Sequence, residues 1–246
     1  MKRPEPIACV LELLAQRYRG ASATFLAGSV MRGEGTDSSD LDLVIVYDHL
    51  DAAYRESFVH EGWPIEAFVH DPETLRYFFL NVDLPSGVPS LIHMVSTGTA
   101  LPAATKLSQD LQAFAQKLLA QGPIPWDDER HRRSRYMITS LVDDLRCPRS
   151  RAELLAAGAA LYEALAAHLL LGDGHWFGKG KSIPRQLTTS LSPQVATQFD
   201  AAFDRLFATS DSGEVIRLCD EVLATCGDSL FEGYKAMAPP DWRITD

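Results

Sequence analysis

The chain has 246 residues, of which 46% are hydrophobic and 23% charged, and these proportions fit a globular protein rather than a disordered or fibrous one. Its 23 basic and 33 acidic residues give a formal net charge of −10, which disfavours non-specific binding to nucleic acids or anionic membranes. The four cysteines are scattered and form no CxxC pair, so neither a disulfide framework nor a zinc knuckle is expected.

Helix and strand patterns alternate over the first 120 residues. Apolar residues at helical spacing predict an amphipathic helix from Ile7 to Tyr18. The later patterns predict strands over 23–27, 40–47 and 63–69, helices over 51–60, from 72 through 78 and beyond, and over 106–120, and an edge strand over 98–101. Residues 30–39 are rich in glycine and serine and are expected to be mainly loop. This order predicts an α+β domain with a mixed sheet and flanking helices.

The second half of the chain carries helical patterns and no strand signal. Residues 121–126 (QGPIPW) predict a stiff linker, so we place the domains at 1–120 and 121–246. Helices are predicted over about 129–146, 151–171, 193–208 and 213–226, which together form an all-α bundle. The apolar stretch 154–171 also contains charged and polar residues, and we interpret it as a buried core helix rather than a membrane span.

The N-terminal sequence MKRPEP contains two prolines and an early acid, which is unlike a secretory signal peptide. A cytoplasmic location is therefore expected, with no membrane association.

Three acidic residues mark two of the predicted strands. Asp40 and Asp42 are two positions apart, so their side chains point to the same face of a strand, where they repel each other unless a cation is present. Glu66 lies in the middle of an otherwise apolar strand, where a lone carboxylate is costly. Oxygen ligands alone suit a hard cation, magnesium above all. The alternative to a metal site is that all three acids are solvent-exposed, Asp40 and Asp42 at the start of a strand and Glu66 on an exposed strand face.

Gly28 and Ser29 directly follow the predicted strand 23–27. Glycine permits a close backbone approach, and a serine hydroxyl with free backbone N–H groups can hold a phosphate. The arrangement Gly-Ser-x10-Asp-x-Asp, followed by an acid on a later strand, resembles the DNA polymerase beta-like nucleotidyltransferase superfamily. It is most similar to the small-molecule branch typified by kanamycin and streptomycin nucleotidyltransferases. The resemblance covers residues 25–69, and the helical half matches more loosely.

The resemblance implies roles for these residues. Gly28 and Ser29 would hold nucleotide phosphates, and Asp40, Asp42 and Glu66 would bind two Mg²⁺ ions. The segment Arg32-Gly33-Glu34-Gly35 looks like the loop that follows the Gly-Ser turn in this family, and we expect Arg32 to contact the nucleotide.

The resemblance implies a metal-dependent enzyme that transfers a nucleoside monophosphate from a nucleoside triphosphate to a hydroxyl of a small molecule. The group expected first is AMP from ATP, and another nucleoside triphosphate is the alternative. Phosphoryl-type transfer needs much negative charge to be neutralised, which two metal ions can do. Domain 1–120 would be catalytic and domain 121–246 would serve as substrate or lid domain. An aminoglycoside-like polycation suits the acidic chain as acceptor, and a nucleic-acid acceptor is not expected. The alternative is a non-catalytic or protein-modifying relative, such as an antitoxin-like or nucleotide-sensing module. The oligomeric state stays open, a homodimer included.

The second half offers weaker candidates. The segment 174–182 nearly spells a phosphate-binding P-loop, but its first glycine is one residue too far and Pro184 interrupts the following helix. Lys179 and Lys181 therefore either touch a triphosphate or lie in a solvated loop. For the base that accepts the hydroxyl proton, Asp144 is the first choice, because it follows Met137 and Leu141 on one side of a helix. The other candidates are Asp143 and Glu163, and ordinary surface acids are the alternative.

Overall fold

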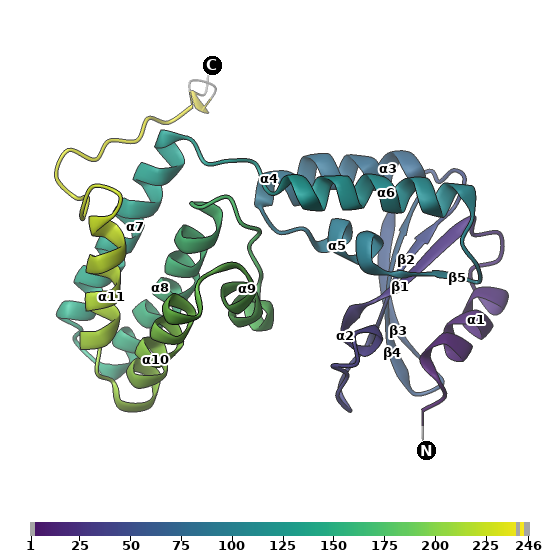
Figure 1. The fold of residues 1–246 in the computed structure, drawn as a ribbon, viewed down its shortest axis with the longest axis horizontal. Coiled ribbons are helices and arrows are strands. Elements are labelled where there is room, and N and C mark those ends of the chain that lie inside the picture. The colour runs from purple at the N-terminus through teal and green to yellow at the C-terminus, as the bar shows by residue number, and fades with distance from the viewer. Residues whose placement is uncertain (1–2, 240–241, 244–246) are drawn as a thin grey trace. The chain divides into compact units, whose positions relative to one another are not determined.

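The computed structural model describes residues 3–239 and 242–243. The chain divides into two compact units, Met1–Ile124 and Pro125–Asp246, and the division lies within the segment 121–126 (Figure 1). The first unit is a mixed sheet with flanking helices and the second is helical. The α+β fold class expected from the sequence is therefore confirmed.

The first unit is built on a five-stranded sheet in the order β3-β4-β2-β1-β5, in which β2 and β4 are parallel and the other neighbours antiparallel. The strands are β1 (Ala23–Ala27), β2 (Leu41–Val46), β3 (Tyr54–His60), β4 (Trp63–His70) and β5 (Thr99–Leu101). The helical segments are α1 (Pro6–Gln16), α2 (Gly28–Met31), α3 (Pro72–Phe78), η1 (Phe79–Asp83), α4 (Leu84–Ser86), α5 (Ser90–Thr97) and α6 (Lys106–Gln121).

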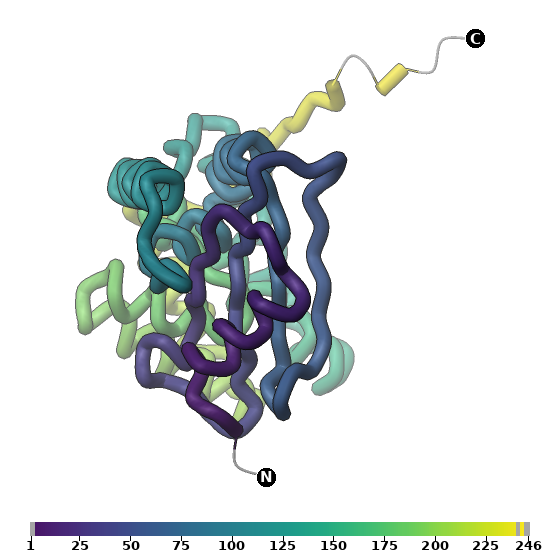
Figure 2. The backbone as a smooth tube through the Cα atoms, turned by 90° about the vertical axis from the view of Figure 1, so that its right-hand side faces the viewer, coloured from purple at the N-terminus to yellow at the C-terminus, as the bar shows by residue number. Residues whose placement is uncertain are grey.

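The two faces of this sheet have different partners. Along β2, the buried residues Leu41, Leu43 and Ile45 share a core with Cys9 and Leu13 of α1, which covers that face of the sheet (Figure 1). Figure 2 looks onto this face and shows α1, in purple, in front of the strands. Since side chains alternate along a strand, the residues between these leucines point to the opposite face. Helix α5 contacts β1 and β2.

The sequence-based prediction of a helix over 51–60 is wrong, because residues Tyr54–His60 form the edge strand β3. The strand pairs antiparallel with β4, and the turn between them consists of Glu61 and Gly62. An edge strand has one unpaired side and one exposed face, so its polar and charged residues do not show the apolar alternation of a buried strand. The pairing with β4, a tertiary interaction, decides the conformation.

The second unit is a helical bundle around one apolar core. Its helices are α7 (Asp128–Arg146), α8 (Arg151–Leu171), the short η2 (Gly180–Ser182), α9 (Ile183–Ser190), α10 (Pro193–Thr209) and α11 (Gly213–Ala224). Leu161 and Leu165 of α8 pack with Phe199 and Phe203 of α10 in this core. Helix α8 is long and apolar enough to cross a membrane by length and composition, but its buried leucines belong to the bundle core, as expected from the sequence. Helix α9 was not anticipated.

A buried carboxylate holds the start of α5. Asp83, only 2% exposed, accepts a hydrogen bond from the backbone N–H of Ile92 at 2.9 Å, and the backbone N–H groups of Leu91 and Ser90 also bond to it. These N–H groups belong to the first turn of α5 and have no partner within the helix. Burial raises the pKa of Asp83 to about 6, against the opposite effect of the three hydrogen bonds.

We predict that Asp83 makes the first unit less stable as the pH rises. The carboxyl pKa in the unfolded chain is about 3.9, so the stabilisation is fully present below that pH and is lost as the pH rises through about 6. The loss between pH 4 and pH 7 is about 3 kcal/mol at most. Asp83→Asn should therefore gain stability relative to the wild type over this range, as measured by urea denaturation at several pH values. The exposed Asp51→Asn is the control, and parallel pH curves for wild type and Asp83→Asn would contradict the prediction.

Candidate metal centre

Asp40, Asp42 and Glu66 converge on one point of the first unit. One carboxylate oxygen from each lies within 4.8 Å of those of the other two. Asp42 on β2 and Glu66 on β4 are direct register partners in the parallel pair, so their side chains emerge on the same face. Asp40 is two positions before Asp42 and shares that face. This is the face opposite α1, and all three side chains are half-buried there.

Arg55 is a cationic neighbour of the three carboxylates. Arg55 on β3 donates from Nη2 to Glu66 Oε1 at 2.7 Å, and its guanidinium lies 4.9 Å from the centre of the Phe68 ring. Both side chains are partly exposed, and an ion pair of this kind contributes roughly 0 to 1 kcal/mol. The three carboxylates provide an all-oxygen donor set, which fits a hard divalent cation such as Mg²⁺.

The sequence pattern did not predict a site role for Arg55. The predicted helix over 51–60 gave no reason to place its side chain beside Glu66. The available signal was Gly62 between two stretches of strand-forming residues, which is compatible with a hairpin turn.

Gly28 lies against the carboxylate of Asp42. Its φ is +88°, and a Cβ built on it would overlap Asp42 Oδ2. The approach arises because Ala27, the last residue of β1, pairs with Asp42 on β2. The sequence predicts that Gly28 lets a phosphate approach the backbone. The structure adds a second requirement, because any larger residue at this position would displace Asp42.

Serine side chains position the loop that leads to Asp40. Ser29 Oγ donates to Ser39 Oγ at 3.4 Å, and Ser39 Oγ accepts from the backbone N–H of Thr36 at 2.8 Å. The loop is therefore folded back onto the short helix α2, which begins at Gly28. Arg32 is exposed, and its Nε donates to Glu34 Oε2 at 3.1 Å.

The remaining candidates belong to the second unit, and their roles stay predictions. Lys179 and Lys181 are exposed residues at the short helix η2. Asp143 and Asp144 are exposed on α7, where Asp143 accepts from Arg146 Nη1 at 2.7 Å. Glu163 is exposed on α8.

No protein-family model matches the chain, and no curated protein matches it in sequence. Among solved structures, it is similar to a nucleotidyltransferase-like protein from Exiguobacterium sibiricum 255-15. That likeness covers 90% of this chain and 75% of that chain, with 14% sequence identity and a TM-score of 0.44.

We predict that Gly28→Ala weakens divalent-cation binding by displacing the Asp42 carboxylate. Gly33→Ala is the matched control, because Gly33 also has a positive φ of +74° but a Cβ there meets nothing within 4 Å. Both variants should lose about 1–2 kcal/mol of stability from the left-handed conformation. Only Gly28→Ala should lower the affinity for Mn²⁺, roughly tenfold or more, in titrations of the folded proteins. Equal Mn²⁺ affinities in the two variants would contradict the assigned role of Gly28.

Proposed function

We propose that this chain is a nucleotidyltransferase that transfers a nucleoside monophosphate, AMP from ATP first of all, to a hydroxyl group of a small molecule. The observation that carries the proposal is the convergence of Asp40, Asp42 and Glu66 on one sheet face, next to the backbone turn that begins at Gly28. The motif over residues 25–69, with its resemblance to small-molecule nucleotidyltransferases, supports the same activity.

The three carboxylates would hold two Mg²⁺ ions. When bound, the ions would neutralise the negative charge of the triphosphate and the charge that develops on the attacking and leaving oxygens. The oxygen-only donor set fits these ions, and the absence of a side chain at Gly28 leaves Asp42 undisturbed. Arg55 is a positioning residue in this scheme, because its hydrogen bond fixes one oxygen of Glu66.

The triphosphate would bind beside the carboxylates, at the start of α2. The Ser29 hydroxyl and the backbone N–H groups of this turn are suited to phosphate oxygens. Arg32 would contribute a positive charge from the same segment. Lys179 and Lys181 would add further positive charge from the helical unit.

The acceptor is proposed to be a cationic, aminoglycoside-like compound. The net charge of −10 favours a cationic ligand over an anionic polymer. A hydroxyl must lose its proton as it attacks phosphorus, so a base is needed besides the metal ligands. Asp144 is the proposed base, with Asp143 and Glu163 as the other candidates.

The first test compares Asp42→Asn with Asp37→Asn. Asp37 is an exposed acid in the loop before Asp40, so its variant makes the same charge change outside the carboxylate group. With ATP, Mg²⁺ and a panel of hydroxyl compounds, Asp42→Asn should release pyrophosphate at least about a hundredfold more slowly than the wild type. Asp37→Asn should remain near the wild-type rate.

Two outcomes count against the proposal. Undiminished activity in Asp42→Asn would exclude a metal-binding role for that residue. A folded wild-type protein that binds nucleotide but never releases pyrophosphate would favour the non-catalytic, nucleotide-sensing alternative.

The second test concerns the base. Asp144→Asn should lower the rate of transfer about 10²- to 10⁴-fold, because a positioned base typically contributes that much, while the affinity for ATP and Mg²⁺ stays near the wild-type value. Asp143→Asn is the matched control, since its carboxylate already pairs with Arg146. A loss of rate in Asp143→Asn alone would move the assignment to that residue, and unchanged rates in both would leave Glu163.

A further inference from the structure

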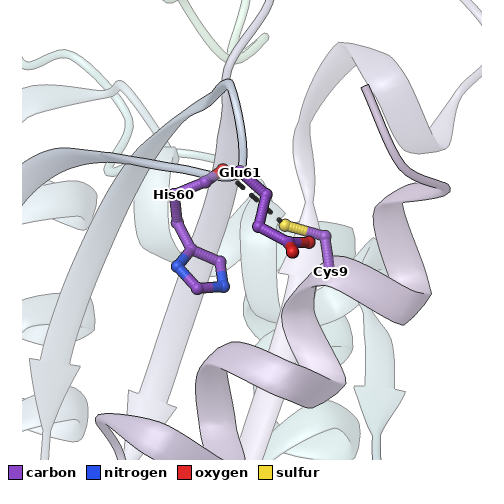
Figure 3. Close-up of side chains that lie close together, drawn as sticks. All are labelled: Cys9, His60 and Glu61. Carbon is purple, nitrogen blue, oxygen red and sulfur yellow. Dashed lines mark hydrogen bonds between the residues drawn. The ribbon is translucent and has the colours of Figure 1, made fainter. Parts of the chain in front are cut away.

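Cys9, His60 and Glu61 form a second group of ligand-type side chains in the first unit (Figure 3). The thiol sulfur, one imidazole nitrogen and one carboxylate oxygen all lie within 4.8 Å of one another. Cys9 comes from α1, His60 is the last residue of β3, and Glu61 begins the turn to β4. The residues come together only because α1 packs against the end of this hairpin.

This group lies on the α1 face of the sheet. His60 pairs with Trp63, and Trp63 belongs to the core that also contains Cys9 and Leu41. Asp42, by contrast, points to the opposite face, as the alternation along β2 requires. The two groups therefore use different faces and have no residue in common.

The imidazole of His60 carries an unsatisfied buried atom. Its Nε2 is buried and has no hydrogen-bond partner. Within residues 3–239 and 242–243, His70 Nδ1 is the only other buried side-chain nitrogen or oxygen without a partner. Buried polar atoms are nearly always paired, and leaving one unpaired costs free energy. A ligand that accepts the lone pair of this nitrogen would remove the cost.

Glu61 occupies a backbone position that does not favour glutamate. Its φ is +47°, and that of the following Gly62 is +82°. Two-residue hairpin turns with positive φ at both positions strongly prefer asparagine, aspartate or glycine at the first. The local backbone conformation therefore does not explain why a glutamate stands at this position. The carboxylate of Glu61 lies beside the Cys9 sulfur (Figure 3), where it can act as a ligand.

The thiol of Cys9 is buried among acceptors and negative charge. Its Sγ lies 3.9 Å from the backbone oxygen of His60. Burial, and then the carboxylates of Glu61 and Glu12, raise the pKa of Cys9 to about 11. These surroundings disfavour a thiolate in the absence of a cation and would favour one when a cation is bound.

We propose that Cys9, His60 and Glu61 form a binding site for a zinc-type divalent cation that ties α1 to the turn between β3 and β4. Thiolate sulfur, imidazole nitrogen and carboxylate oxygen are the ligand types that Zn²⁺ takes in proteins, and three protein ligands leave the fourth tetrahedral position to water. Mg²⁺ does not favour a thiolate, so this site and the carboxylate group select different ions. On binding, Cys9 releases its thiol proton to solvent and a zinc–sulfur bond replaces the S–H bond. The inference does not depend on the proposed transferase activity.

The test is cobalt substitution of the full, reduced chain. Co²⁺ bound to a thiolate gives a sulfur-to-cobalt charge-transfer absorption band, which the all-oxygen group at Asp42 cannot produce. We expect one equivalent of Co²⁺ to give this band and Zn²⁺ to abolish it by displacement. Cys9→Ser should eliminate the band.

Glu61→Gly separates loss of a ligand from loss of folding. Glycine suits the positive φ at this position, so the variant should keep or raise the melting temperature of the metal-free protein. Its affinity for Zn²⁺ should nevertheless fall roughly tenfold or more. Unchanged Zn²⁺ affinity in Glu61→Gly would overturn the site as proposed, even if Cys9→Ser fails to fold.

Two cysteine variants serve as controls. Cys226 Sγ lies 3.7 Å from His168 Nε2 in the helical unit, which is a competing cysteine–histidine pair, and Cys147 is exposed. Cys226→Ser and Cys147→Ser should both keep the cobalt band. Loss of the band in either control, its survival in Cys9→Ser, or its absence from the wild type would refute the proposal.

Discussion

The parallel pairing of β2 with β4 is the constraint on which the candidate metal centre depends. It sets Asp42 directly opposite Glu66, although carboxylates at this spacing repel each other. The register is fixed from the other face, where Leu41, Leu43 and Ile65 are buried beneath α1. A shift by one residue would exchange the faces of the whole strand. Hydrophobic burial on one side of the sheet therefore holds together the charges on the other.

The neighbouring strands complete the same arrangement. Strand β1 ends where Gly28 meets Asp42, and the lack of a side chain at Gly28 leaves room for that carboxylate. Strand β3, at the sheet edge, brings Arg55 to Glu66. The partly exposed ion pair is weak enough to coexist with a bound divalent cation. The geometry of the site is thus a property of four strand segments rather than of one motif.

The β3–β4 hairpin links the two proposed cation sites. Glu66 lies on one face of β4, and the turn that contains Glu61 directly precedes Trp63, the first residue of β4 in the apolar core on the α1 side. A cation held by Cys9, His60 and Glu61 would fasten α1 to this hairpin, and the hairpin carries Glu66. The two sites differ in chemistry, because one offers only oxygen and the other also sulfur and nitrogen.

Features that depend on short-range sterics and periodicity could be predicted from the residues alone. The alternation along 40–47 placed Asp40 and Asp42 on one face, and the Gly-Ser pair after a strand indicated a close backbone turn. Long-range contacts, in contrast, place β4 beside β2, make residues 54–60 a strand that brings Arg55 to Glu66, and bring Cys9 of α1 to Glu61. Strand neighbours and helix docking follow from the burial of the whole sheet, which no local pattern contains, because the stabilising contacts join residues far apart in the chain.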